Sequence, residues 1–167
     1  MQMPKLGRRT ALLAAAATMT TGLFAAAGAA PAMADTVTVN YDCVGYPSDI
    51  AVTIDAPATA GVGDTATFEV SSVVTTGAPQ DLPAGEVVTD MAIVVGGAQS
   101  GTITASGLTN EATPAGQPVN MVGGEAQITF TSAGSVTFTP STTTQVDNGA
   151  QCTVVGEAPV GATTVVS

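Results

Sequence analysis

The sequence predicts an all-β protein, an antiparallel β-sandwich of about eight or nine strands, that follows a cleaved export signal. Val, Thr, Ile and Phe fall in short runs with a period of two residues. Gly, Pro, Asn and Asp separate these runs at intervals of about 8 to 12 residues, and helical periodicity is nearly absent, which is the pattern of a sandwich. All three basic residues lie within the first nine positions.

The first 34 residues have the three parts of a signal peptide. Residues 1–9 are positively charged, residues 12–30 are apolar and rich in alanine, and Ala32-Met33-Ala34 is an A-x-A cleavage signal. We expect cleavage between Ala34 and Asp35, which leaves one domain over residues 35–167 (167 − 34 = 133 residues). A transmembrane anchor is the alternative for the apolar stretch, but its Ala, Gly and Thr content makes it weakly hydrophobic. Arg8-Arg9 leaves twin-arginine export as an alternative to the general secretory route.

The charge of the mature chain excludes several classes of function. It carries 13 acidic residues and no Lys, Arg or His. Nucleic acids and anionic lipid surfaces are bound mainly through Lys and Arg, so we expect neither as a partner and no membrane insertion after signal removal. Without His or Lys, Ser-His-Asp, Cys-His and Schiff-base catalysis are impossible. We therefore expect a protein that is not an enzyme and needs no cofactor.

The first strands alternate clearly between a core face and a solvent face. A Gly-rich turn at residues 61–64 separates the second strand from the third. The expected inward residues are Val37, Val39, Tyr41 and Cys43 in the first strand, Ile50, Val52 and Ile54 in the second, and Ala66, Phe68, Val70 and Ser72 in the third.

The second half of the chain continues the pattern. One strand has Val87, Thr89, Met91, Ile93 and Val95 on its inward face; weaker strands are expected at residues 101–106 and 118–122; and Ala126, Ile128, Phe130, Val136 and Phe138 point inward from the strands that follow. Asn148-Gly149 is the preferred pair for a two-residue type I′ turn, so we expect it to join strands at residues 142–147 and 150–155.

Two cysteines lie near opposite ends of the mature chain. Cys43 has the parity of the inward residues of the first strand, and Cys152 shares parity with Val154. Export to an oxidising compartment favours a Cys43–Cys152 disulfide. Two unpaired buried thiols are the alternative.

Short motifs along the mature chain resemble a known group of proteins. They are Tyr41-Asp42-Cys43, Ala56-Pro57 followed by Val62-Gly63-Asp64, the Thr- and Gly-rich segment 131–140, and the late Cys152. From about Tyr41 to Val155 the chain resembles secreted actinobacterial immunoglobulin-like β-sandwich domains of unknown function. The resemblance implies an immunoglobulin-like fold, a secreted or cell-envelope location and a disulfide between the ends of the domain, with no catalytic residues to transfer.

The acidic residues supply the remaining candidate sites. Asp81, Glu86 and Asp90 form the densest group, which could act as a glycosidase carboxylate pair or simply lie on a solvated face. Calcium could bind near Asp35, Asp42, Asp49, Asp64 or Asp147, although no D-x-D-x-D spacing occurs. A third possibility is capture of a small molecule between the sheets. The leading hypothesis is a non-enzymatic secreted or envelope-associated structural or interaction domain, whose partner is an unknown protein or envelope component; a small-molecule carrier or a calcium-binding sandwich is the alternative.

Overall fold

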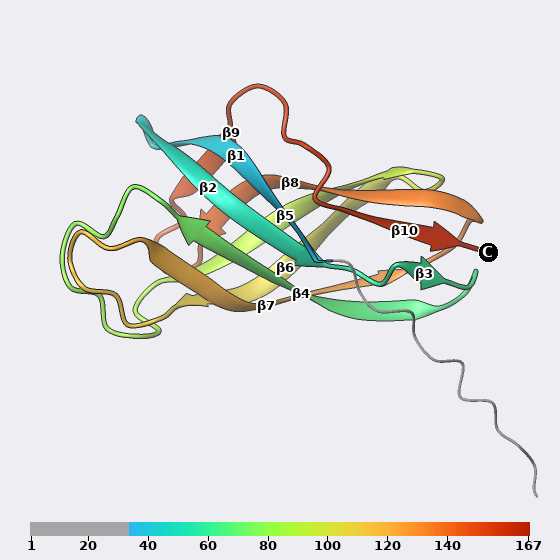
Figure 1. Cartoon of the computed structure of the whole chain (residues 1–167), viewed down its shortest axis with the longest axis horizontal. Coiled ribbons are helices and arrows are strands. Elements are labelled where there is room, and N and C mark those ends of the chain that lie inside the picture. The colour runs from blue at the N-terminus through green and yellow to red at the C-terminus, as the bar shows by residue number, and fades with distance from the viewer. Residues whose placement is uncertain (1–33) are drawn as a thin grey trace, which may run out of the picture.

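The computed structural model describes residues 34–167, so the predicted signal peptide lies outside the described residues except for Ala34. The described chain is all-β, as predicted (Figure 1). Its strands are β1 (Asp35–Cys43), β2 (Tyr46–Asp55), β3 (Thr59–Ala60), β4 (Thr65–Val74), β5 (Val88–Gly97), β6 (Gly101–Asn110), β7 (Val119–Thr129), β8 (Gly134–Gln145), β9 (Gln151–Val154) and β10 (Ala162–Val166). Within residues 34–167, no helix has the length and apolar character needed to cross a membrane.

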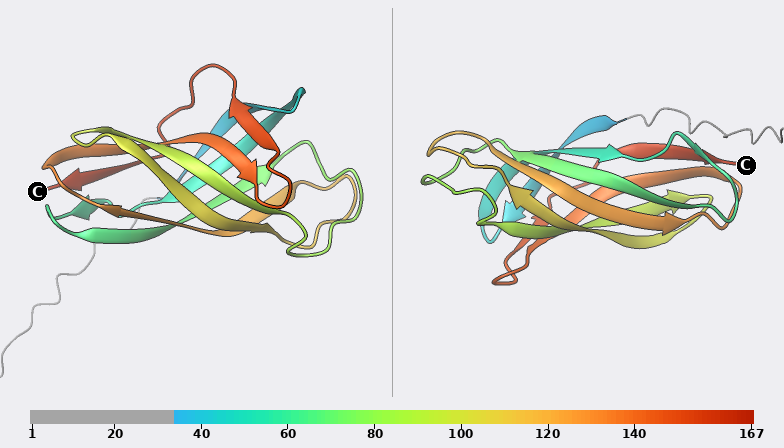
Figure 2. Two further views of the ribbon diagram at one scale, coloured as in Figure 1. Left: turned by 180° about the vertical axis from the view of Figure 1, so that it is seen from behind. Right: turned by 90° about the horizontal axis from the view of Figure 1, so that it is seen from below.

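The strands form one sheet that closes on itself. The order is β3-β10-β8-β5-β6-β7-β4-β2-β1-β9, and β9 also pairs with β8, so the eight strands from β8 around to β9 form a closed barrel. Closure depends on two residue pairs, Thr143 with Cys152 and Thr144 with Gln151. At the other end of β8, β10 pairs with β8 on the edge that β9 occupies further along, and the two-residue β3 pairs with β10 in parallel (Figures 1 and 2).

Closure corrects the prediction of a two-sheet immunoglobulin-like sandwich. Alternating strands separated by turn residues are expected in either architecture, because both bury one face of every strand. What distinguishes them here is that β9 pairs with β1 as well as with β8. The hairpin with β8 was expected, but no local pattern specifies that the same strand also pairs with β1. The predicted strands at 118–122 and 126–130 are also a single strand, β7, and β10 was not predicted at all.

Two glycine bulges keep the apolar side chains inside the barrel. In β6 the buried positions change from odd to even number after Gly107, and in β7 they change between Met121 and Ala126, next to Gly123. Gly107 and Gly123 have positive φ values of 85° and 77°, which glycine adopts without steric cost. Asp90 accepts a hydrogen bond from the Gly107 amide at 3.1 Å, which fixes the first bulge.

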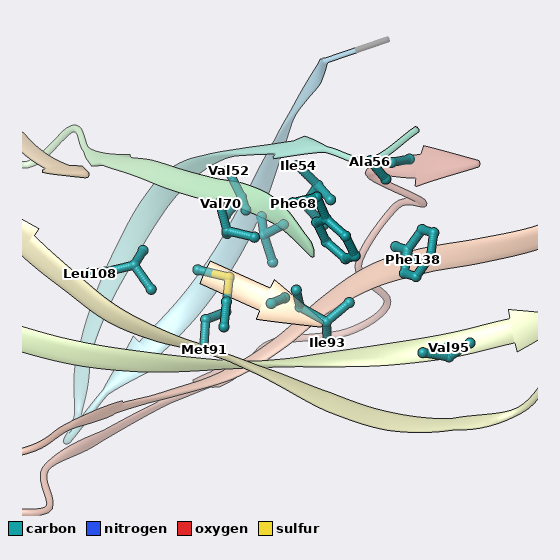
Figure 3. Close-up of a cluster of buried hydrophobic side chains, with 14 of the residues drawn as sticks. Val52, Ile54, Ala56, Phe68, Val70, Met91, Ile93, Val95, Leu108 and Phe138 are labelled. Atoms are coloured by element: carbon teal, nitrogen blue, oxygen red, sulfur yellow. The ribbon is translucent and has the colours of Figure 1, made fainter. Parts of the chain in front are cut away.

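The core matches the predicted inward faces. Phe68 on β4 and Phe138 on β8 meet across the interior, with ring centroids 5.1 Å apart (Figure 3). Tyr41 is fully buried, and its hydroxyl donates a hydrogen bond of 2.7 Å to the carbonyl of Ser141 on β8. Burial raises the pKa of Tyr41 to about 12, because the charged phenolate would be desolvated there.

The predicted hairpin exists, but its turn differs. Four residues, 146–149, separate Gln145 from Ala150, and the amide of Gly149 donates to the Gln145 carbonyl at 2.9 Å. The two-residue turn instead joins β1 to β2 at Val44-Gly45, where Cys43 pairs with Tyr46. Both turn residues have positive φ (56° and 88°), as a type I′ turn requires. Val44 is a β-branched residue in a conformation that it adopts only at a cost.

Candidate functional site: a cavity at one end of the barrel

A cavity of about 500 Å³ opens at the end of the barrel where β1, β4 and β8 end and β2, β5, β7 and β9 begin. This volume lies within the range of about 300–1,000 Å³ that is usual for small-molecule sites. Its lining is drawn from seven strands and the loops between them: Cys43, Val44, Ser48, Ile50, Ser72, Val74, Thr76, Gly77, Pro79, Leu82, Val87, Thr89, Val119, Met121, Thr143, Gln145, Ala150, Gln151 and Cys152.

No charged residue lines this cavity, although the described chain is strongly acidic. The apolar part of the lining consists of aliphatic side chains and Met121, and the polar part consists of hydroxyl and carboxamide groups. Such a lining solvates an uncharged molecule with a large apolar surface and a few hydrogen-bonding groups. It would not compensate the desolvation of an ion deep inside.

Two serine hydroxyls reach the cavity from its wall. Ser48 on β2 and Ser72 on β4 are 9% and 6% exposed, and both line the cavity. No side-chain oxygen or nitrogen that is fully enclosed within the described part of the chain lacks a hydrogen-bond partner. The two hydroxyls form no hydrogen bond with another described residue, so they retain access to the cavity. They are available to a bound molecule as donors or acceptors.

The disulfide forms part of the wall. Cys43 and Cys152 are joined with an S–S distance of 2.03 Å and a Cα–Cα distance of 4.0 Å, in the pairing that the sequence predicted. They lie directly opposite each other on β1 and β9. The bond holds the short β9 against β1 at the place where the barrel closes, and it therefore fixes one side of the cavity.

Two long loops complete the mouth, and Asn110 organises them. The loop at residues 75–87 runs beside the loop at 111–118 (Figures 1 and 2), and the two exchange backbone hydrogen bonds between Leu82 and Thr113. Asn110 is 2% exposed; its carboxamide accepts from Val87 N at 2.7 Å and donates to the carbonyls of Pro83 and Glu111. The sequence did not predict a role for Asn110, because its side chain points inward only after the bulge at Gly107 changes which positions of β6 face the interior.

The candidate carboxylates serve as turn and loop contacts. Asp81 accepts from Ala115 N at 2.8 Å and so links the two mouth loops, while Glu86 is exposed. Asp42 accepts from Gly45 N, and Asp64 accepts from Gly61 N at 2.7 Å. Asp49 accepts from the Asn40 carboxamide at 2.8 Å.

These carboxylates do not converge on one point. Nowhere in residues 34–167 do three Asp, Glu, His or Cys side chains gather as a group that could hold a metal ion. The calcium alternative therefore gains no support from the arrangement of Asp35, Asp42, Asp49, Asp64 and Asp147.

Both ends of the described chain lie away from the cavity. Asp35 begins β1, and Cys43, the ninth and last residue of that strand, lines the cavity. Val166 near the C-terminus pairs with Gly134 at the opposite end of β8 from Gln145 (Figure 1). Comparison with protein-family models, curated proteins and solved structures finds no match to this chain.

Proposed function

We propose that this chain is a non-enzymatic, extracytoplasmic binding domain that holds an uncharged, largely apolar small molecule in the cavity at the end of its barrel. The observation that carries the proposal is the uncharged lining of about 500 Å³ within a chain that has 13 carboxylates and, after Arg9, no cation. A preformed apolar pocket with a few convergent polar groups is the usual form of a small-molecule site.

The groups available in the cavity support binding rather than catalysis. They are aliphatic side chains, hydroxyls, carboxamides and a disulfide. None of these exchanges a proton near neutral pH, so general acid–base chemistry would require a group from outside the lining.

A location outside the cytoplasm is supported by the disulfide, since such bonds persist in oxidising compartments. The first strand begins at Asp35, immediately after the expected cleavage site at Ala34. Because both chain ends lie opposite the cavity, a domain tethered to the envelope by either end would present the cavity mouth outward.

The tip of the β1–β2 hairpin favours a second role at the same end, contact with a protein or envelope component. Val44 and Tyr46 are 72% and 76% exposed, and Val44 also lines the cavity. An exposed apolar tip that holds a valine in a costly conformation is unfavourable for an isolated domain. A partner that covers the mouth would bury it.

The test is native mass spectrometry of the mature protein purified from the medium of the producing cells, compared with its mass after denaturation. The proposal predicts an adduct of a small molecule that denaturation releases. A Ser72→Phe variant, which fills the cavity, should lose the adduct, while Ser135→Phe on the exposed face of β8 should keep it. An adduct that persists in folded Ser72→Phe would place the ligand elsewhere, and the absence of any adduct would count against a carrier.

A further inference from the structure

We infer that the cavity binds a neutral alcohol, phenol or ketone whose oxygen enters first and forms a hydrogen bond with Ser72 at the inner end. This inference rests on the proposed binding function, because it names the class of ligand and its orientation in the same cavity. The observation behind it is a buried hydroxyl without a partner, which lies beneath an apolar section of the wall.

Strand register places Ser72 at the inner limit of the cavity. On β4, which runs toward the mouth, Ser72 is the first residue to line the cavity, and Val74 follows two residues, or about 7 Å, closer to the mouth. The neighbours of Ser72 across the sheet are Met121 on β7, which also lines the cavity, and Val52 on β2, which does not. Val52 and Val70 belong to the packed core (Figure 3), so the cavity ends at Ser72 and Met121 on this side of the barrel.

The hydroxyl of Ser72 faces the cavity and has no partner among the described residues. Ser72 is 6% exposed, and its inward neighbours along β4, Val70 and Val74, are apolar. No fully enclosed side-chain oxygen of residues 34–167 lacks a hydrogen-bond partner, so a hydroxyl that has none must open into the cavity. Because a serine hydroxyl both donates and accepts, it can pair with a ligand hydroxyl or with a carbonyl oxygen.

The wall just outside Ser72 matches an apolar ligand body. Ile50, Val74 and Val119 lie side by side on β2, β4 and β7, one level closer to the mouth. A ligand that reaches the inner end displaces the water that would otherwise solvate Ser72, and an apolar leading end cannot replace that hydrogen bond. An ionised leading group would lose its own hydration without gaining a counter-charge. A neutral oxygen at the end of an apolar body meets both conditions.

Two probes of nearly equal shape test the inference: 1-naphthylmethanol and 1-ethylnaphthalene, in which a methyl group replaces the hydroxyl. Naphthalene fluorescence at pH 7 gives the dissociation constant of each probe for the wild-type mature protein, Ser72→Ala and Ser48→Ala. Ser72→Ala should weaken the alcohol about three- to tenfold, which is the contribution of one hydrogen bond between neutral groups, and should not weaken the hydrocarbon. A purely structural effect of the substitution would change both probes alike.

Ser48→Ala is the matched control. It removes the same hydroxyl from the cavity wall nearer the mouth, two residues from Tyr46, where β2 begins. It should change the affinity for the alcohol much less than Ser72→Ala does.

Intermolecular NOEs give the orientation without any substitution. The carbinol protons of 1-naphthylmethanol should contact the methyl group of Met121, which lies beside Ser72, and the ring protons should contact Ile50 and Val74. Carbinol contacts with Val44 at the exposed tip of the β1–β2 hairpin would show that the oxygen points outward and would overturn the inference.

The outcomes separate the two proposals. If the alcohol binds but Ser72→Ala weakens it no more than it weakens the hydrocarbon, or no more than Ser48→Ala does, the role of Ser72 is wrong while the cavity remains a binding site. If neither probe binds the wild-type protein, the proposed function itself is refuted, and this inference with it.

Discussion

Removing the Cys43–Cys152 disulfide should cost about 5 kcal/mol of folding stability. The two cysteines are 109 residues apart, and closing a loop of that length in the unfolded chain has an entropic cost of about 5 kcal/mol at 25 °C. Apart from the disulfide, few backbone pairs hold β9 in the barrel, because it pairs with β1 at three positions and with β8 at two. Without the bond, β9 should detach before the rest of the barrel unfolds, opening one wall of the cavity.

The assay is thermal and urea unfolding of the oxidised protein, the reduced protein and the Cys43→Ala/Cys152→Ala variant. The last two should agree with each other and melt on the order of 15 °C below the oxidised protein. Amide exchange should accelerate first at residues 151–154. A loss of less than 1 kcal/mol, or unchanged exchange in β9, would show that strand pairing alone keeps the barrel closed and that our reasoning is wrong.

Three further predictions concern single residues. The raised pKa of Tyr41, about 12, means that the folded state holds this proton more tightly than the unfolded state does. About 2–3 kcal/mol of folding stability is therefore present below pH 10 and lost between pH 10 and 12. In a Tyr46→Phe variant the absorbance change at 295 nm should have its midpoint near pH 12, and a midpoint near 10 in the folded protein would contradict this. Val44→Asn should raise stability by about 1 kcal/mol in urea unfolding, because asparagine tolerates the positive φ of the turn, and a loss would mean that Val44 has stabilising contacts. Glu125→Gln should add a few tenths of a kcal/mol at low salt, by relieving repulsion from Glu69 directly opposite, and the gain should vanish in 0.5 M NaCl; a gain that is independent of salt would require another cause.

The parts of the fold that follow from local pattern were predictable. Val39, Tyr41, Ile50, Val52 and Ile54 point inward as their alternation indicates, because a strand with one buried face must alternate. Inward parity at both cysteines, together with the predicted export signal, was sufficient to predict the disulfide.

Features that depend on long-range pairing were not predictable. The hairpin of β8 and β9 was predicted, but nothing in the sequence shows that β9 also pairs with β1, so a barrel could not be distinguished from a sandwich. The turn at Val44-Gly45 was missed because valine rarely adopts positive φ, while Asn148-Gly149 matched the preference and still formed a longer loop.

The cavity could not be predicted either. It arises where seven strands end together and where the loops at 75–87 and 111–118 lie side by side. Ser48 and Ser72 have the parity of core residues, and nothing in the sequence distinguishes a serine that faces a cavity from one that is packed against its neighbours.

The central claim is that the uncharged end of the barrel binds an apolar molecule, and the most direct test is methyl NMR of the mature protein titrated with 1-naphthylmethanol. Ile50, Val74, Val119 and Met121 line the cavity, whereas Val136 and Val166 lie buried toward the opposite end. We predict saturable shifts, enlarged by the aromatic ring current, at the first group and little change at the second. Shifts that do not saturate, or that are largest at Val136 and Val166, would contradict a binding site at this end of the barrel.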